Sequence, residues 1–239
     1  MKKVDIVIPC LNEENVLEQS IDTLRNFLKE NMSEYDNTIT IADNGSTDAT
    51  LEIAKRLTEQ YPEVRFNTLD KKGRGRALKK TWSESDADIV SYMDVDLSTD
   101  LKALPPMINA IANENYHLGT GTRLAKNSNT KRGFKRDFIS RVYNLMVKTI
   151  LWTKYSDAQC GFKAVDKKIY DQLHPVLKDN EWFFDTEMLT IAEKKGFKLF
   201  EIPVTWIEDT DSRVKIINTA YKYIRDLIRL RTRIIFKKI

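Results

Sequence analysis

The chain has 239 residues, of which 41% are apolar and 31% charged, and its formal net charge is +4. This composition is typical of a soluble globular protein that is long enough for one α/β domain. No run of about 18 apolar residues occurs, which excludes a membrane-spanning helix. Residues 214–239 contain eight Lys and Arg against one Asp, a net +7, which leaves −3 for residues 1–213. A basic tail on such a body predicts a localised anionic partner and argues against general nucleic-acid binding.

The first half of the chain alternates strand-like and helix-like segments. Strands are predicted at residues 4–9, 38–42, 64–69 and 89–93. Helices are predicted to begin at Asn12 as N-cap, after the turn cluster 43–48, and near Arg76. This order predicts an α/β fold with a mostly parallel central sheet flanked by helices. In such sheets ligands bind at the carboxyl ends of the strands.

The second half is less regular. The predicted elements are, in order, a helix at 101–112, a strand near 118, a basic stretch at 126–141, a helix ending near 152, a strand around 162, a helix at 185–195 and a strand at 199–206. We expect one domain at 1–213 and a basic amphipathic helix at 214–239. Its apolar stripe between Lys and Arg residues suits an anionic membrane surface. The alternative is a core-packing helix whose outer face is basic.

The N-terminus and the rarer residues add three expectations. A short strand-like run follows Lys3 without the apolar region and cleavage site of a signal peptide, so we expect a cytoplasmic protein. Cys10 and Cys160 lie far apart and are expected to be reduced thiols. His117 and His174 lack ligand partners at useful spacing, so a histidine-based zinc site is not expected.

Polar clusters follow three of the predicted strands, at residues 9–13, 43–46 and 94–96. Asp94 and Asp96 lie two residues apart where the chain leaves a buried strand, so both carboxylates can converge on one hard cation. Mg²⁺ or Mn²⁺ held there would neutralise a diphosphate leaving group. The alternative is that both aspartates cap the next helix and are solvated.

These clusters carry a family resemblance. Pro9-Cys10-Leu11-Asn12-Glu13, Asp43-Asn44-Gly45-Ser46-Thr47-Asp48, Lys72-Gly73-Arg74-Gly75 and Asp94-Val95-Asp96-Leu97 resemble the successive motifs of family 2 glycosyltransferases with the GT-A fold. Segments 121–123, 136–141, 157–163, 182–187 and 201–206 resemble the polyprenyl-phosphate sugar synthases, with the glucose-type branch closer than the mannose type. The resemblance covers nearly the whole chain in the same order.

The resemblance implies roles for the donor side of the site. Pro9, Leu11 and Glu13 would frame the base and ribose, Asp43 would contact the nucleoside, and Arg74 would face the diphosphate. Each position also has a structural alternative: Asp43 as a turn former, Glu13 as a first-turn helix charge and Arg74 as an exposed loop cation. The donor would be a UDP- or GDP-sugar.

The remaining implied roles concern the metal, the sugar and the acceptor. Asp94, Asp96 and Ser98 would hold the metal, and Asp185 or Glu187 would line the sugar. The acceptor would be a polyprenyl phosphate in a membrane. Arginine binds phosphate with a two-pronged fork, and the expected acceptor ligands are arginines: Arg123, Arg136, Arg141 and Arg213.

Three positions depart from the pattern of the relatives. Ser98 stands where a Gln often contacts the metal, Asn44 replaces the second Asp of the common Asp-Asp-Gly-Ser, and Lys163 replaces an Arg of the mannose type. Serine is a shorter, neutral ligand, so weaker metal binding is expected.

The sequence thus predicts a metal-dependent inverting glycosyltransferase that acts peripherally on the cytoplasmic face of a membrane. Three alternatives stay open. They are transfer to a sugar or protein hydroxyl with Asp185 as base, a sugar-nucleotide pyrophosphorylase, and a membrane or nucleic-acid adaptor without activity. The sequence does not predict the sugar, the base of the donor, the metal or the oligomeric state.

Overall fold

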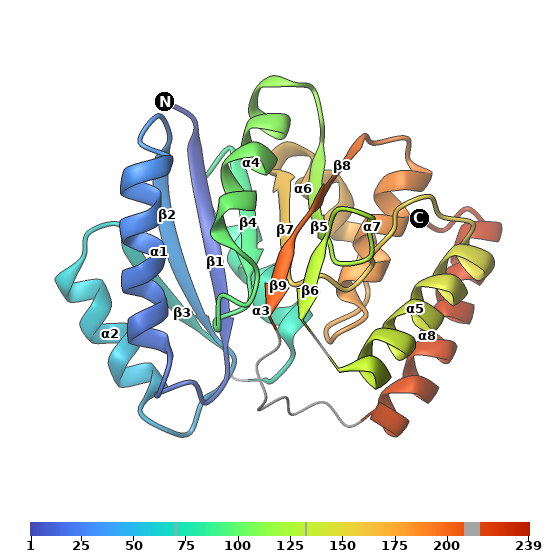
Figure 1. Cartoon of the computed structure of the whole chain (residues 1–239), viewed down its shortest axis with the longest axis horizontal. Coiled ribbons are helices and arrows are strands. Elements are labelled where there is room, and N and C mark those ends of the chain that lie inside the picture. Colours follow the sequence, from blue (N-terminus) through green and yellow to red (C-terminus); the bar gives the residue numbers. More distant parts are fainter. Residues whose placement is uncertain (70, 132, 208–215) are drawn as a thin grey trace.

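The centre of the fold is a seven-stranded sheet in the order β3-β2-β1-β4-β7-β5-β8 (Figure 1). The computed structural model describes residues 1–69, 71–131, 133–207 and 216–239, and their side chains except at 216–221. β7 is antiparallel to both of its neighbours, and the other pairs are parallel. The predicted mostly parallel sheet is confirmed. Its strands are β1 (Lys3–Cys10), β2 (Asp36–Asp43), β3 (Val64–Thr68), β4 (Ile89–Met93), β5 (Leu118–Thr122), β7 (Phe162–Asp166) and β8 (Leu199–Pro203).

Helices cover both faces of this sheet. They are α1 (Leu17–Asn31), α2 (Thr50–Gln60), α3 (Arg74–Glu84), α4 (Leu104–Asn113), α5 (Phe134–Leu151), α6 (Lys167–Leu173), α7 (Phe184–Lys194) and α8 (Ile216–Ile235), with short 3₁₀ turns at Leu101–Ala103 and His174–Val176. β6 (Asn129–Lys131) and β9 (Thr205–Ile207) form a separate two-stranded sheet.

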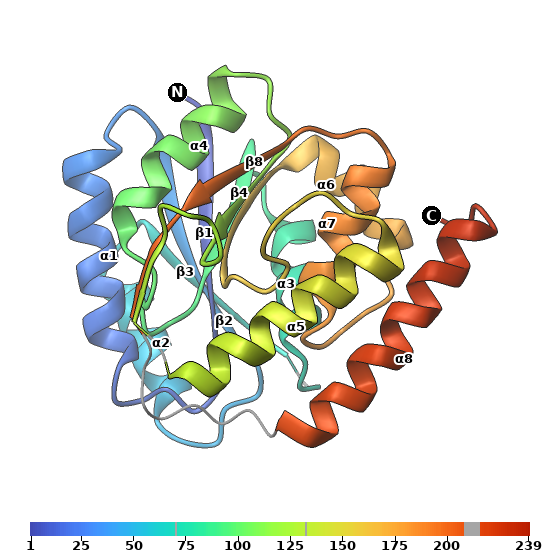
Figure 2. The same cartoon turned by 45° about the vertical axis from the view of Figure 1, so that its right-hand side comes forward.

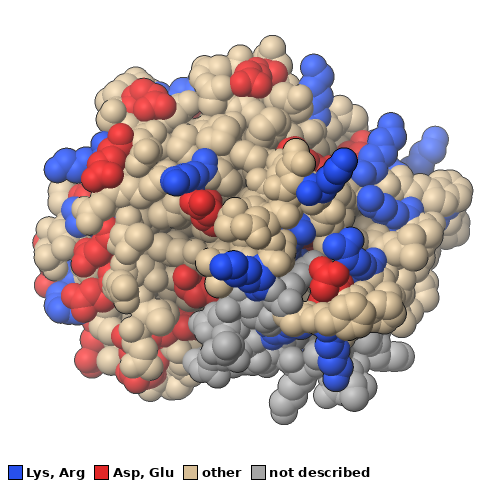
Figure 3. All heavy atoms as spheres, viewed as in Figure 1, with Lys and Arg blue, Asp and Glu red and all other residues tan. Residues whose placement is uncertain are grey.

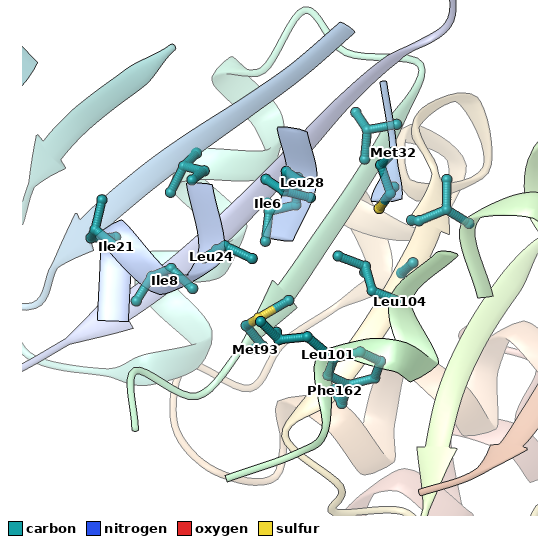
Figure 4. Packing of buried hydrophobic residues seen from close by; sticks show 14 of the residues in the cluster. Ile6, Ile8, Ile21, Leu24, Leu28, Met32, Met93, Leu101, Leu104 and Phe162 are labelled. Carbon is teal, nitrogen blue, oxygen red and sulfur yellow. The ribbon is translucent and has the colours of Figure 1, made fainter. Parts of the chain in front are cut away.

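Alternating side chains of the central strands supply two separate cores. In β1, Ile6 and Ile8 join the core beneath α1 and α4, whereas Val7 points to the opposite core beneath α3 and α7. Figure 4 shows the first core, where Leu24 and Leu28 of α1 approach β1. Because β1 and β4 are buried along most of their length, a ligand can reach these strands only near their ends.

Several predicted boundaries move in the structure. Asn12 is not an N-cap: its φ is +56°, its side-chain Oδ1 accepts a hydrogen bond from the Thr47 N–H at 2.8 Å, and α1 begins only at Leu17. The predicted strand at 199–206 is divided at Val204 into β8 and β9. α3 begins at Arg74, two residues earlier than predicted, so this arginine lies at the helix N-terminus.

The C-terminal helix packs against the body of the protein. α8 lies beside α5 (Figure 2), with the rings of Tyr143 and Tyr223 4.8 Å apart. Leu227 and Leu230 are fully buried in the second core. One face of the helix therefore follows the core-packing alternative. Within the described ranges, no helix is both long enough and apolar enough to cross a membrane.

Candidate active site

The sheet topology brings distant polar residues to one edge. β1, β2 and β4 are parallel and end at Cys10, Asp43 and Met93. β5 runs in the same direction, because β5 and β4 are both antiparallel to β7. Arg123, which follows β5, therefore lies at the same edge as Asp94, which follows β4.

Asp94 lies against the backbone of Gly161. Met93 pairs with Phe162 in the sheet, and the Asp94 N–H donates to the Gly161 carbonyl at 3.2 Å. A Cβ at Gly161 would lie 1.8 Å from Asp94 Oδ2, so only glycine leaves room for this carboxylate. Asp96 is exposed, and its Oδ1 accepts a hydrogen bond from the Ser98 N–H at 3.0 Å.

Arg74 connects two carboxylates at this edge. Its guanidinium lies 3.3 Å from Asp94 Oδ1 and 2.9 Å from Asp185 Oδ2. The rings of Tyr92 and Trp182 approach its Cζ at 4.8 and 4.9 Å. Arg74 Nε is buried without a hydrogen-bond partner among the described residues. A buried charged donor at a helix N-terminus is well suited to an anion.

Asp185 is the buried anchor of this cluster. It is 1% exposed and accepts hydrogen bonds from Arg74 and, at 2.5 Å, from the Tyr92 hydroxyl. The buried Lys163 ammonium lies 3.7 Å from its Oδ1. This carboxylate therefore fixes the position of Arg74.

The pKa values of Asp94 and Arg74 are both raised, for different physical reasons. Burial raises the pKa of Asp94, and repulsion from Asp96 and Asp185 adds to this against the attraction of Arg74. Burial alone would lower the pKa of Arg74, but Tyr92, Asp185 and Asp94 raise it well above its ordinary value. Arg74 is thus a permanent cation, and the carboxylates of Asp94 and Asp96 form a region where a further cation is favoured.

The residues present fit a divalent metal that is shared with a substrate. Among the described residues, no three His, Cys, Asp or Glu side chains gather closely enough to hold a metal without other ligands. Mg²⁺ and Mn²⁺ sites that use substrate phosphates need only one or two protein carboxylates. The half-buried Asp94 in its glycine cradle and the exposed Asp96 provide such a pair.

Arg123 is held by a buried partner. Its side-chain Nε and Nη2 donate to the two carboxylate oxygens of Asp157 at 2.8 and 3.1 Å. Its backbone N–H also donates to Asp157 Oδ2, at 3.1 Å. Burial would raise the pKa of the fully buried Asp157, but Arg123 lowers it to about 2. If Arg123 binds a phosphate as predicted, it does so with a guanidinium that Asp157 already orients.

The two loops predicted to face the nucleotide are joined to each other. The Asn12 N–H donates to Ser46 Oγ at 2.9 Å, and the Glu13 N–H donates to Thr50 Oγ1 at 2.8 Å. Asp43 is 2% exposed, and its carboxylate accepts hydrogen bonds from the backbone of its own turn. The turn-forming alternative for Asp43 is therefore present in the structure, and a nucleoside contact stays a prediction.

Pro9, Leu11 and Glu13 are half-buried at the first strand end, consistent with a rim position. The structure does not bring Glu187 to the Arg74 cluster. Glu187 is fully buried, accepts hydrogen bonds from the backbone of Lys178 and Asp179, and pairs with Arg233 of α8. These contacts give Glu187 a structural role, and its contact with the sugar stays a prediction.

Two of the other predicted acceptor ligands lie in the first half of α5. Arg136 is half-buried in its first turn, and the exposed Arg141 pairs with Asp137 at 2.6 Å. Arg213 lies outside the described residues. Their expected role toward a phosphate remains a prediction.

Four contributors were not singled out as site residues from the sequence. In the sequence, Tyr92 is only part of a predicted strand, and Asp157, Gly161 and Trp182 are only parts of motifs. A signal for Asp157 was available, since an aspartate on the approach to the strand predicted around residue 162 requires a partner if it is buried.

Replacing Gly161 with alanine is expected to displace Asp94, because the new Cβ would overlap its carboxylate. The expected result is a loss of the predicted transferase activity of about tenfold or more, with only a modest change in melting temperature. Gly133→Ala is the matched control, since a Cβ there would have no described atom within 4 Å apart from its chain neighbours. Initial rates and thermal melts of both variants test this. Equal activity of the two would contradict the cradle assigned to Gly161.

Comparisons with known proteins agree with this geometry. Residues 5–173 match the model of glycosyl transferase family 2. Glycosyltransferase AglD of Haloferax volcanii is 34% identical over 220 residues, which cover 90% of this chain and 35% of AglD. Dolichyl-phosphate beta-glucosyltransferases of Saccharomyces cerevisiae and Dictyostelium discoideum are 27% and 25% identical, over 95% and 96% of this chain and 74% of each relative. The chain thus spans about a third of AglD and about three quarters of these two relatives.

The fold has solved counterparts. Glucosyl-3-phosphoglycerate synthase from Mycobacterium tuberculosis, in complex with UDP, superposes with a TM-score of 0.68 at 17% identity, covering 96% of this chain and 79% of that one. At this identity the likeness concerns the fold, which is the GT-A architecture expected from the sequence. The family match over most of the chain decides the classification: this protein is a glycosyltransferase of family 2.

Proposed function

We propose that the chain transfers a sugar, with glucose favoured, from a nucleotide-sugar to a polyprenyl phosphate with inversion at the anomeric carbon. The observation that supports this most is the Arg74 cluster, where a buried guanidinium with an unused Nε lies beside Asp94 at the carboxyl edge of the sheet. The acceptor is inferred from the dolichyl-phosphate beta-glucosyltransferases, which align over nearly the whole chain.

The residues at the edge divide the work of the reaction. Asp94 and Asp96 would hold Mg²⁺ or Mn²⁺, with Ser98 as a weaker third position, and the bound cation would stabilise the charge of the departing diphosphate. Arg74 would bind a diphosphate oxygen through the donor that the protein leaves unused. Asp185 and Tyr92 keep Arg74 in place throughout.

The acceptor would be oriented from the opposite side of the site. Arg123, held by Asp157, together with Arg136, Arg141 and Arg213, would bind the lipid phosphate. A phosphate oxygen is already anionic near neutral pH, so it can attack the anomeric carbon without a strong general base. Positioning and charge stabilisation then supply the catalysis.

The state of Asp185 favours this reaction over transfer to a hydroxyl. A hydroxyl acceptor needs a base within hydrogen-bond reach. Asp185, the candidate base, is 1% exposed and already accepts from Arg74 and Tyr92. It is built to position a cation, which leaves the phosphate acceptor as the better match.

A transfer assay with a panel of acceptors tests the proposal. UDP-glucose and GDP-mannose, each radiolabelled, are incubated with the protein, Mn²⁺ and either polyprenyl phosphate in detergent or soluble sugar acceptors. We expect an organic-extractable, lipid-linked product from one donor and none with the soluble acceptors. A product only on soluble acceptors would replace this function with hydroxyl glycosylation. Release of pyrophosphate from a sugar phosphate and a nucleoside triphosphate would replace it with a pyrophosphorylase.

The cellular setting follows from the acceptor. A polyprenyl phosphate resides in a bilayer, and nucleotide-sugars are cytoplasmic donors in this scheme. We propose a peripheral enzyme on the cytoplasmic face of a membrane, with residues 1–213 forming the catalytic domain and residues 214–239 contributing to the membrane contact.

A further inference from the structure

The outer side of α5 exposes a row of large apolar side chains. Phe134 is 87% exposed, Phe138 60% and Leu145 62%, and Val142 lies between them. Their spacing of four, four and three residues places them on one side of the helix. The opposite side buries Val147 in the second core. Single exposed apolar residues are ordinary, but an aligned row on a well-packed helix marks a contact surface.

α8 extends this row sideways. Its Ile224 and Ile228 are also exposed, four residues apart. The Arg231 guanidinium lies 3.8 Å from the centre of the Trp152 ring at the end of α5. The Tyr143–Tyr223 and Trp152–Arg231 contacts show that the two helices run in the same direction, as Figure 2 shows. The two exposed rows therefore lie on neighbouring parallel helices, and together we call them the apolar row.

Basic side chains border the apolar row. On α5, the helical spacing puts the exposed Arg141 and Lys148 along one border and Lys135 along the other, and Arg225 is exposed on α8. Figure 3 shows that Lys and Arg predominate on the side of the molecule where α5 and α8 lie. An apolar strip between cations matches a bilayer, whose acyl region is apolar and whose anionic headgroups are charged.

We propose that the apolar row of α5 and α8 docks on an anionic lipid bilayer, with α5 making the larger contact. This deepens the proposed function and rests on it for the identity of the acceptor. It also adds α5 to the membrane contact that is expected of residues 214–239. One face of α8 packs on the body of the protein, and from this helix Arg233 pairs with the buried Glu187.

The position of the apolar row supports this occupant. α5 begins directly after β6, and Thr130 Oγ1 of β6 donates to the Arg123 carbonyl at 3.1 Å. The first residue of the row, Phe134, thus lies only a few residues from the corner of the site that would hold the acceptor phosphate. A bilayer on the row presents its lipid phosphates at that corner.

Vesicle co-sedimentation of the full chain tests the docking surface. Leu145→Ser is compared with Ile207→Ser, which removes an equally bulky side chain, 55% exposed, from β9. Wild type and Ile207→Ser are expected to pellet with phosphatidylcholine vesicles that contain phosphatidylglycerol, and raised salt should weaken this binding. Leu145→Ser is expected to bind these vesicles about tenfold more weakly than wild type. The single variant Phe138→Ser should bind them more weakly still, because it removes a larger apolar side chain. Lys148→Gln should lower binding more than Lys55→Gln on α2.

The transfer assay separates this inference from the proposed function. Leu145→Ser should lose activity on polyprenyl phosphate embedded in vesicles but keep it on a short-chain polyprenyl phosphate dissolved in buffer. Equal vesicle binding by Leu145→Ser and wild type would overturn the docking surface. So would a wild type that ignores vesicles and instead forms a dimer that Leu145→Ser disrupts. If wild type binds vesicles through the row but glycosylates neither lipid, the proposed function fails and the docking surface stands.

Discussion

Asp96→Asn is expected to lower the rate of sugar transfer by about a hundredfold or more, because one of the two carboxylates offered to the metal loses its charge. Asparagine keeps the Oδ1 that accepts from the Ser98 N–H, so the turn after β4 should remain folded. Initial rates at saturating donor and Mn²⁺, together with thermal melts, measure both effects. The loss should appear in the rate and not in the melting temperature.

Asp100→Asn is the matched control. Asp100 is exposed four residues further on, and it accepts from the Lys102 N–H at 3.0 Å in the same manner. Its substitution should leave the transfer rate within about twofold of wild type, as for a surface change away from the site. Similar rates for the Asp96 and Asp100 variants would refute the metal assignment. They would also revive the interpretation of Asp96 as a solvated cap.

Arg123→Met is expected to destabilise the fold by about 3–5 kcal/mol, because it leaves the fully buried Asp157 without its cationic partner. Arg65→Met provides the comparison: Arg65 pairs with Asp86 at 3.3 Å on the surface, where both side chains are exposed, and should cost less than about 1 kcal/mol. Urea denaturation of both variants, analysed with a common slope, gives the two free energies of unfolding.

The double variant Arg123→Met/Asp157→Asn shows whether the cost arises from the stranded charge. Asparagine carries no charge, and its single side-chain oxygen can still accept from one of the two backbone N–H groups that donate to Asp157, those of Arg123 and Gln159. We expect the double variant to recover a substantial part of the loss, as a coupled pair does in a double-mutant cycle. No recovery, or equal losses for the Arg123 and Arg65 variants, would show that the Arg123–Asp157 pair is not the buried anchor described here.

The edge of the sheet could be predicted from local patterns. β4 occupies the residues expected for it, since its apolar run is bounded by Asp88 and Asp94. Parallel topology then required the segments after β1, β2 and β4 to meet. Asp43 and Asp94 could be assigned to one edge because Asp43 ends β2 and Asp94 directly follows β4. Strand ends are set by short-range sequence.

The pairing of side chains across that edge could not be predicted in this way. Arg74 and Asp185 are separated by 111 residues, and Arg123 and Asp157 by 34. Only the packing of α7 and of the loop before β7 decides these contacts, and neither leaves a periodic trace in the sequence. Glu187 illustrates the same difficulty. It lies two residues after Asp185 in α7, so the two side chains leave the helix on nearly opposite sides. Asp185 faces the site, whereas Glu187 pairs with Arg233.

The terminal helix shows a limit of amphipathic patterns. Basic and apolar residues alternate along α8 in a way that suits both a membrane and a core. In the structure Leu227 and Leu230 enter the core, while Ile224 and Ile228 stay outside. The sequence does not reveal which apolar residues of α5 are exposed. The exposed row and the buried face of this helix both have apolar residues three or four positions apart.

The central claim is that the carboxyl edge of the sheet binds a nucleotide-sugar through a divalent cation on Asp94 and Asp96. Calorimetric titration of the wild-type chain with UDP-glucose, and with GDP-mannose in parallel, tests it most directly when each is run with Mn²⁺ and again with a chelator. The structure predicts that one donor binds at least about tenfold more tightly with Mn²⁺, because without it the diphosphate faces two carboxylates. Binding of equal strength with and without the cation would contradict the claim.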